Sequence, residues 1–282
     1  MKTRGIKKLF PAQEMLEGAG VVVKRSLSGA SVAETDPFLM LDELGSDDVQ
    51  KYEKGFPFHP HRGIQTVTYM KRGSVVHEDS LGNCGVIEDG DVQWMTAGSG
   101  IIHQEMPRPY KGTSQGFQLW INLPHEKKMT DPKYRGITKE HIPEIRTDDA
   151  VLRVIAGKYG DKTGPVTDSA TPVAYFDVAL QSEKTFSYDI QNTFNAILYV
   201  YEGTITIGDD KKEINARTAV LLTEGDNISV HAKEDAQFLL FAGEPLHEPI
   251  AWHGPIVMNT EMELLEALEA YRNGTFVKGR PS

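Results

Sequence analysis

Cysteine is nearly absent from this chain, because Cys84 is the single one among 282 residues. One thiol cannot form an intrachain disulfide, which excludes the disulfide-stapled scaffolds of small secreted proteins. No apolar run reaches the roughly 18 residues that a membrane helix needs, and the N-terminal segment lacks the apolar core of a secretory signal. The sequence therefore predicts a cytoplasmic protein that does not associate with a membrane.

Basic clusters and nucleotide-binding motifs are lacking as well. The chain has 40 acidic and 30 basic residues, a net charge of -10, and no run of five Lys or Arg. A polyanion such as nucleic acid would be repelled by this mean field. Glycine-rich phosphate loops and the G-x-S-x-G motif of serine hydrolases do not occur, and Cys84 is expected to be a turn thiol rather than a nucleophile.

Short runs rich in Val, Ile, Thr and aromatic residues are abundant, with glycine and proline spread between them. Such runs with closely spaced turn signals are typical of β-sandwiches and β-barrels. The chain is therefore expected to be all-β. The expected strands include residues 20–26, 65–70, 117–123, 151–155, 173–180, 196–201, 219–222 and 238–242.

Helical periodicity is scarce except near the C-terminus. Thr260 followed by Glu263 forms a capping box, the signature of a helix start, and Gly274 can end the helix. We predict one helix over about 261–272 that packs on a sheet. Its apolar stripe is expected to consist of Leu264, Leu265, Leu268 and Tyr271.

A weak internal repeat divides the chain into two similar halves. Residues 69–76 resemble 199–206, and residues 88–91 resemble 223–226, so that in each half a strand, a glycine turn, a second strand and a Gly-Asp turn follow one another. The repeat predicts two β-domains in tandem. The charged, proline-containing stretch 124–146 is the expected linker, and the predicted domains are 1–145 and 146–282.

Two pairs of potential metal ligands stand in the first half. His59 and His61 are two residues apart, as are His103 and Glu105. Side chains at positions i and i+2 of a strand project from the same face, so two such strands can direct four ligands at one ion. Three imidazoles and a carboxylate suit Fe, Mn, Ni, Cu or Zn.

Each pair alone is a weak signal, because such pairs also occur on solvated strands. Together, in one half and flanked by apolar residues, they favour a metal, since buried imidazoles without a partner are costly. The repeat offers an internal control, because the matching positions in the second half carry no such cluster. We therefore expect the second domain to bind no metal; those positions are Asp189, Gln191, Phe238 and Leu240.

Four segments resemble the pirin family. They are HPHRGIQTVTY (59–69), VQWMTAGSGIIHQEMP (92–107), FQLWINLP (117–124) and AWHGPIVMNT (251–260). The resemblance covers nearly the whole chain. It implies a bicupin, that is, two tandem cupin-type β-barrels (jelly rolls), of which only the first, 1–145, holds a metal.

The resemblance also implies a ligand set and an activity. The metal would be one divalent ion, Fe(II) before Mn, Ni, Cu or Zn, held by His59, His61, His103 and Glu105. Many pirins have a glutamate where this chain has Gln65, an amide that can at most orient a neighbouring histidine. Several pirins are similar to quercetin 2,3-dioxygenases, which open a flavonol ring with O2 and release CO.

In this interpretation the flavonol 3-hydroxyl loses its proton to Glu105, the expected catalytic base. Trp94, Phe56 and Phe58 are expected either to line a pocket for the flat aromatic or to belong to the barrel core. Two alternatives stay open. One is an iron-dependent regulatory protein that binds a transcription factor or metabolic enzyme without catalysis, and the other is a Zn or Mn isomerase that needs no O2.

Overall fold

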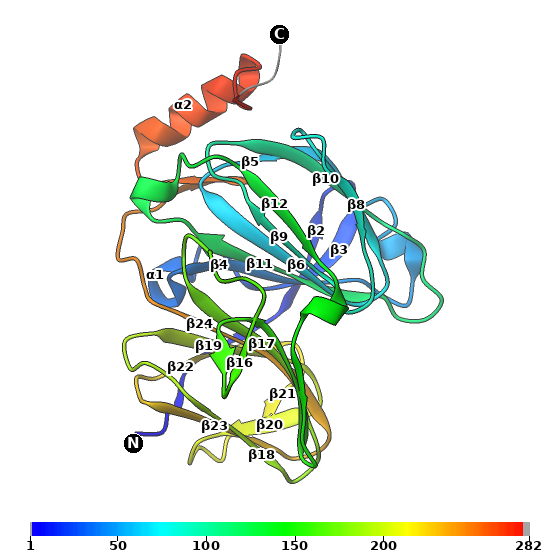
Figure 1. Cartoon of the computed structure of the whole chain (residues 1–282), viewed down its shortest axis with the longest axis vertical. Coiled ribbons are helices and arrows are strands. Elements are labelled where there is room, and N and C mark those ends of the chain that lie inside the picture. The colour runs from blue at the N-terminus through cyan, green and yellow to red at the C-terminus, as the bar shows by residue number, and fades with distance from the viewer. Residues whose placement is uncertain (1, 279–282) are drawn as a thin grey trace. The chain divides into compact units, whose positions relative to one another are not determined.

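The computed structural model describes residues 2–278, and these form two compact units (Figure 1). One, here called the histidine unit, consists of 13–30, 38–139 and, within the described residues, 246–278. The other, called the companion unit, consists of 2–12, 31–37 and 140–245 within the described residues. Among the described residues, no helix is long and apolar enough to cross a membrane.

The histidine unit contains a seven-stranded and a four-stranded sheet. The larger has the strand order β12-β9-β6-β11-β4-β3-β2, and the smaller has the order β5-β10-β7-β8. A two-stranded ribbon, β25-β26, belongs to the same unit. The strands are β2 (Gln13–Glu17), β3 (Val21–Leu27), β4 (Phe38–Leu44), β5 (Phe56–His61), β6 (Ile64–Arg72), β7 (Val75–Asp79), β8 (Cys84–Ile87), β9 (Val92–Thr96), β10 (Ile101–Pro107), β11 (Gln115–Asn122), β12 (Lys133–Ile137), β25 (Ala251–His253) and β26 (Ile256–Met258).

The companion unit repeats this plan. Its seven-stranded sheet has the order β1-β22-β19-β24-β17-β14-β13, and its four-stranded sheet has the order β18-β23-β20-β21. The strands are β1 (Ile6–Pro11), β13 (Glu144–Arg146), β14 (Ala150–Ala156), β15 (Lys158–Tyr159), β16 (Lys162–Thr163), β17 (Val173–Leu180), β18 (Thr185–Asp189), β19 (Asn195–Glu202), β20 (Thr204–Ile207), β21 (Ile214–Asn215), β22 (Thr218–Leu222), β23 (Asn227–Ala232) and β24 (Ala236–Gly243). The short helices of the chain are α1 (Val32–Thr35), η1 (Val49–Lys51), η2 (His125–Lys127) and η3 (Lys139–His141).

This architecture confirms the predicted all-β class. All eight expected strands are present to within about two residues at their ends, and the run over 173–180 coincides with β17. The turn expected at Cys84 is instead the start of β8, where the thiol is exposed. The stretch 124–146 is not a plain linker, because it contains η2, β12, η3 and β13.

The chain alternates between the two units rather than completing one before the other. Residues before 13 and 31–37 belong to the companion unit, while the stretch after 245 belongs to the histidine unit. The repeat detected in the sequence covers one strand from each of the two sheets of a unit, β6 and β7 in one unit and β19 and β20 in the other. It carries no information on edge strands such as β1, which pairs with β22.

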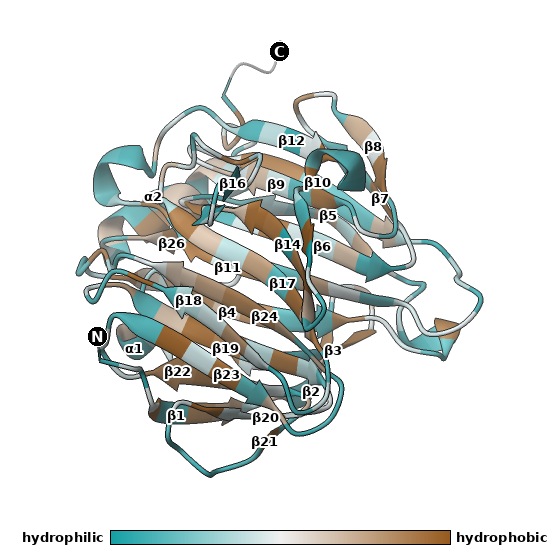
Figure 2. Ribbon diagram, turned by 60° about the horizontal axis from the view of Figure 1, so that its bottom comes forward, coloured by the Kyte–Doolittle hydropathy of each residue, from teal (hydrophilic) through white to brown (hydrophobic). Residues whose placement is uncertain are grey.

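A continuous apolar core joins the two sheets of the companion unit. Residues from both of its sheets share one buried cluster, which includes Phe176 on β17, Phe186 on β18 and Val230 on β23. Phe238 and Leu240 lie in the same cluster. Figure 2 shows β17 and β24 coloured mainly as hydrophobic. Burial of this apolar surface, at roughly 25 cal/mol per Å², drives the two sheets together.

The C-terminal helix α2 (Glu261–Arg272) has the predicted bounds and cap. The Thr260 hydroxyl accepts from the Glu263 backbone, and the Glu263 carboxylate accepts from the Thr260 backbone. The buried face differs in part from the expected stripe, because Leu265 is exposed while Ala267 is buried. Leu264 and Ala267 pack against Ile256 and Met258 of the β25-β26 ribbon, which confirms that the helix packs on a sheet.

Candidate metal centre

Strands β5 and β10 bring the predicted histidines together. The two strands pair antiparallel, with His103 opposite His59. The ring centroids of His59 and His61 lie 4.9 Å apart. The centroid of the His103 ring lies 4.4 Å from that of His59 and 5.0 Å from that of His61. One ligand atom from each of the three lies within 4.8 Å of the others. As strand geometry predicts, His59 and His61, two residues apart, project from the same face of β5.

In each of the three rings one nitrogen, Nδ1, contacts a neighbouring group, and the other, Nε2, faces the cluster. Nδ1 of His59 lies 2.9 Å from the Pro57 carbonyl, and Nδ1 of His61 lies 3.2 Å from the Pro255 carbonyl. Nδ1 of His103 lies 3.4 Å from Nδ1 of His77. Histidines that bind metals almost always donate their other ring N–H in this way. In each ring the nitrogen left to bind an ion would therefore be Nε2.

The Nε2 atoms are arranged as the ligands of one cation would be. The Nε2 atoms of His59 and His61 lie 3.1 Å apart, and Nε2 of His103 is buried without a hydrogen-bond partner. Two nitrogens that each bind one ion at about 2.1 Å, at a right angle, lie about 3.0 Å apart. An unpaired buried nitrogen costs free energy that a metal ion would offset. The three imidazoles thus fit one divalent ion.

The environment keeps two of these imidazoles in the form that binds metals. Burial, with help from the neighbouring His59 ring, holds the pKa of His61 well below its usual value near 6.5. Burial and the adjacent imidazoles lower the pKa of His103 in the same way. A metal-binding imidazole must be unprotonated, so both rings are ready to coordinate an ion at neutral pH.

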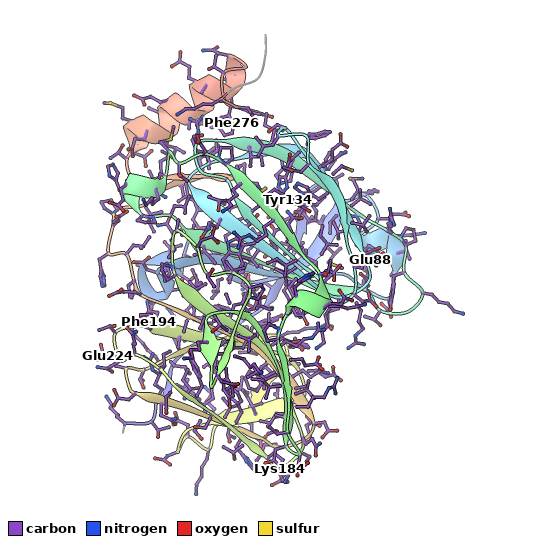
Figure 3. The ribbon with its side chains drawn as sticks, in the orientation of Figure 1. Glu88, Tyr134, Lys184, Phe194, Glu224 and Phe276 are labelled. Carbon is purple, nitrogen blue, oxygen red and sulfur yellow. The ribbon has the colours of Figure 1, made fainter. Side chains whose placement is uncertain are left out.

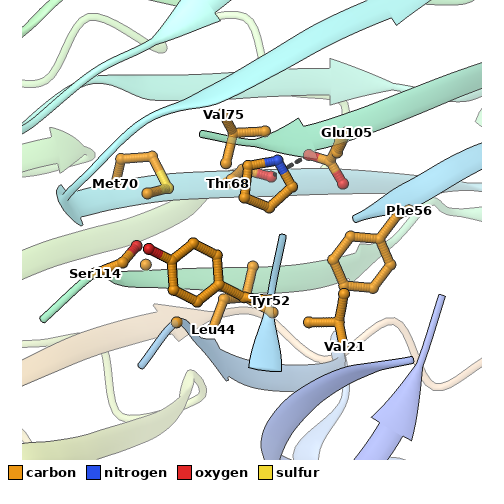
Figure 4. A pocket seen from close by; sticks show the side chains of 12 residues that line it. Val21, Leu44, Tyr52, Phe56, Thr68, Met70, Val75, Glu105 and Ser114 are labelled. Atoms are coloured by element: carbon orange, nitrogen blue, oxygen red, sulfur yellow. Dashed lines mark hydrogen bonds between the residues drawn. The ribbon is translucent and has the colours of Figure 1, made fainter. Parts of the chain in front are cut away.

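Glu105 lies on the same strand as His103 but outside the group of three imidazoles. A register shift separates it from His103 in the pairing of β10 with β5. Its Oε1 atom accepts from the Thr68 hydroxyl at 3.0 Å (Figure 4), and its Oε2 atom accepts from the Gln118 amide at 2.8 Å. Gln118 is itself oriented, because its carbonyl accepts from the Trp120 indole N–H at 3.0 Å. The carboxylate is therefore held in one position.

A cavity of about 640 Å³ opens onto this cluster. Its wall includes His59, His61 and Glu105 together with Trp120 and Trp252. The two indoles lie 5.9 Å apart. A volume of this size, with aromatic walls and a few polar groups, is typical of a small-molecule site. A smaller cavity of about 20 Å³ lies on another side of Glu105, between Thr68, Tyr52 and Phe56 (Figure 4).

Of the three aromatic residues expected at the pocket, one lines it. Phe56 is part of the cavity wall, whereas Phe58 is 51% exposed and Trp94 is buried elsewhere. Phe58 lies on β5 and Trp94 on β9, and the side chains of both are outside the cavity wall. The sequence analysis missed Trp120 and Trp252, although both stand inside the segments FQLWINLP and AWHGPIVMNT.

The turn after His61 is fixed by a buried lysine. Lys128 is 1% exposed, and its ammonium donates to the carbonyls of Gly63 and Val257 and to the Asn122 side chain at 2.7–3.1 Å. Gly63 has a φ of +78°, and a Cβ atom there would collide with the Val257 carbonyl. Only glycine therefore fits this turn, which sets the direction in which β5 ends.

Gln65 and the pair His77 and Asp79 are further buried polar residues of the histidine unit. The Gln65 amide donates to the Thr96 hydroxyl on β9 at 2.9 Å. The sequence analysis overlooked His77 and Asp79, which are fully or almost fully buried. Their signal was another pair of polar residues two apart on a strand. Burial opposes ionisation of Asp79, but hydrogen bonds from His77 and from the loop after β7 hold its pKa below the usual value.

Comparison with known proteins identifies the family of the chain. The family model for pirin matches residues 20–121, and the model for the pirin C-terminal cupin domain matches residues 175–277. A pirin-like protein of Caulobacter vibrioides is 42% identical over 98% of this chain and 100% of its own length. A Pseudomonas aeruginosa protein provisionally named a quercetin 2,3-dioxygenase is 41% identical over 96% of this chain and 97% of its own.

A solved structure leads to the same family. A quercetin 2,3-dioxygenase from Acinetobacter baumannii superimposes with a TM-score of 0.90 at 35% sequence identity, covering 98% of this chain and 99% of that one. The two units are accordingly two cupin domains. The chain belongs to the pirin family.

Proposed function

We propose that this protein is a metal-dependent dioxygenase which opens the central ring of flavonols such as quercetin and releases CO. The observation that carries the proposal is the convergence of three imidazoles, two of which line a cavity whose wall also includes Glu105 and two indoles. The names of two relatives, from Pseudomonas aeruginosa and Acinetobacter baumannii, support the same reaction.

The proposed ligands are His59, His61 and His103, with Glu105 as the fourth. Fe(II) is the proposed ion, since imidazole nitrogen and carboxylate oxygen together suit a redox-active first-row metal. When bound, the ion supplies Lewis acidity and redox chemistry for the reaction with O2.

The cavity explains how a flat polyphenol would be bound. Trp120 and Trp252 offer apolar faces near the imidazoles, because the ring of His61 meets the Trp120 ring edge-on at a centroid distance of 5.0 Å. Aromatic rings stack well on such faces. Arg25 and Asp42 form a polar part of the same wall, where their side chains are joined by two hydrogen bonds of 2.8 and 2.7 Å. Hydroxyl groups of the substrate can therefore find partners there.

Glu105 is the proposed base that removes the proton of the flavonol 3-hydroxyl. Its two hydrogen-bond donors, Thr68 and Gln118, each occupy one oxygen. A carboxylate has about four acceptor positions, so each oxygen retains room for another proton. Because both donors fix the carboxylate, no reorganisation is needed when the proton arrives.

O2 consumption by Fe(II)-loaded protein tests the proposal. We expect quercetin to start O2 uptake with loss of the flavonol, and His61→Ala to abolish both metal binding and uptake. His253→Ala, an exposed histidine of the same unit, is the matched control and should behave as the wild type. No uptake by iron-loaded wild-type protein would contradict the proposal and favour a regulatory protein that binds a partner without catalysis.

A further inference from the structure

His77 and Asp79, on strand β7, form a hydrogen-bonded chain that leads into the histidine cluster. Nε2 of His77 lies 2.9 Å from Asp79 Oδ2, and Nδ1 of His77 lies 3.4 Å from Nδ1 of His103. All three side chains are buried. Neither His77 nor Asp79 belongs to the group that can hold an ion, so the pair can act on that group only through His103.

The Asp79 carboxylate can only accept hydrogen bonds in this chain. Backbone N–H groups of Leu81 and Asn83 donate to its Oδ1 at 2.9 and 3.1 Å, and the Asn83 side-chain amide donates to both oxygens. An ionised carboxylate has no proton to give. The proton between Asp79 and His77 therefore lies on Nε2 of His77.

That proton decides the tautomer of the next ring. A neutral imidazole carries one N–H, so Nδ1 of His77 is an acceptor. The proton between the two Nδ1 atoms must then belong to His103. With its proton on Nδ1, His103 presents a bare Nε2, which is the buried nitrogen that has no hydrogen-bond partner.

We propose that Asp79 and His77 are positioning residues that hold His103 in the tautomer which binds the metal ion. The inference rests on the metal site proposed above and not on the reaction performed there. Tyr134 of β12, labelled in Figure 3, stacks on His77 with ring centroids 4.4 Å apart and planes 22° apart. This stack fixes the plane of the His77 ring, on which both of its hydrogen bonds depend.

Asp79→Asn separates tautomer control from packing. The asparagine carbonyl would keep accepting from the backbone of Leu81 and Asn83, which turns the new amide nitrogen toward His77. That nitrogen donates, so His77 has to accept at Nε2 and carry its proton on Nδ1. His103 then accepts at Nδ1 and carries its proton on Nε2, where it cannot bind a metal. In serine proteases the corresponding exchange also produces the wrong tautomer in an intact geometry.

Nitrogen-15 NMR of the metal-free protein with labelled histidine is the direct test, because long-range couplings report which ring nitrogen carries the proton. We expect the proton on Nδ1 in His103 and on Nε2 in His77, with both reversed in Asp79→Asn. Signals are assigned with His77→Phe, which retains a ring to stack on Tyr134. A wild-type His103 with its proton on Nε2 would overturn the proposal without any variant.

Calorimetric titration with nickel(II) gives a second readout that needs neither O2 nor a flavonol. We expect Asp79→Asn and His77→Phe to weaken nickel binding about 10- to 100-fold, the usual effect of losing a group that orients a ligand. Asp91→Asn is the matched control, since this buried carboxylate accepts from the backbone of Glu88 and Lys139. It should bind nickel as the wild type does.

Wild-type nickel affinity in Asp79→Asn would show that the pair only packs, and would overturn the proposal. A negative dioxygenase assay changes neither the tautomers nor the nickel affinity. The proposed reaction and the proposed positioning chain therefore fail separately.

Discussion

Glu105 is the residue whose exchange tests the proposed base, which is also the proposed fourth ligand. Glu105→Gln retains the size of the side chain and a carbonyl for the Thr68 or Gln118 donor, but removes the basic oxygen. We expect kcat for quercetin to fall about 10²- to 10⁴-fold, the usual contribution of a general base, while the three imidazoles still bind iron. Steady-state kinetics with a parallel iron assay measures this, and Glu78→Gln, an exposed carboxylate on β7, is the control.

A Glu105→Gln variant with full iron content and wild-type kcat would contradict the proposed role of Glu105. It would leave the carboxylate as a structural acceptor for Thr68 and Gln118. That result would also remove Glu105 from the proposed ligands but would leave the three imidazoles, which do not depend on this carboxylate for their hydrogen bonds.

Trp252 is the residue that tests the aromatic wall of the cavity. It lines the cavity, and its indole N–H donates to the Gly254 carbonyl at 2.7 Å, which holds the ring in place. We expect Trp252→Ala to raise KM for quercetin about tenfold, which corresponds to roughly 1.4 kcal/mol of lost stacking and burial, with a smaller change in kcat. Phe58→Ala, outside the cavity wall, should change neither constant; an unchanged KM in Trp252→Ala would show that substrate binds elsewhere.

At the scale of the element, the start of α2 makes a pH-dependent prediction. Partial burial opposes ionisation of the Glu263 carboxyl, but hydrogen bonds from Thr260 and Asn259 hold its pKa below the usual value near 4.5. A carboxyl whose pKa is lower in the folded state stabilises that state above its unfolded pKa. This contribution is lost as the pH falls through the folded pKa. The helix cap should therefore weaken in acid.

The matching experiment compares wild type with Glu263→Gln by amide hydrogen exchange in α2. Near neutral pH we expect the variant to open more readily by roughly 0.5–1 kcal/mol, because it loses a charge at a helix N-terminus. The difference should shrink below pH 4.5, once the wild-type carboxyl is protonated. Equal protection of wild type and variant at neutral pH would contradict this account of the cap.

The elements also show what sequence patterns can predict. The run 173–180 is recognisable as a strand because its apolar residues are buried in a sheet, and the pair His59 and His61 because strand side chains alternate. Neither pattern contains the partner of a strand. Pro255, which accepts from His61, is 194 residues away in sequence, and no local rule connects them. His77 was missed for the same reason, since its role follows from the rings beside it.

At the scale of the whole molecule, each unit is built from stretches that are not contiguous in the sequence. The ribbon β25-β26 and helix α2 belong to the histidine unit, although 106 residues of the companion unit, 140–245, precede them. The segment supplies the carbonyl of Pro255 to His61 and buries an apolar cluster with α2. The predicted boundary at 145 separates this segment from the histidines that it supports.

A fragment consisting of residues 1–145 tests this interleaving. We expect it to bind nickel at least tenfold more weakly than the whole chain, because it lacks the Pro255 acceptor and exposes the surface that β25, β26 and α2 cover. Titration calorimetry and circular dichroism measure affinity and folding together. A fragment that folds and binds nickel as tightly as the full chain would show that the sequence boundary is also the boundary of the folding unit.

The central claim is that one ion is held by His59, His61 and His103, and X-ray absorption spectroscopy of the Fe(II)-loaded protein tests it most directly. The multiple-scattering signal of imidazole counts the rings around the metal. We predict one iron per chain with three imidazoles in the wild type, and a loss of bound iron or of one imidazole in His103→Ala. An iron with fewer than three imidazoles in the wild type, or a spectrum unchanged by that substitution, would contradict the account.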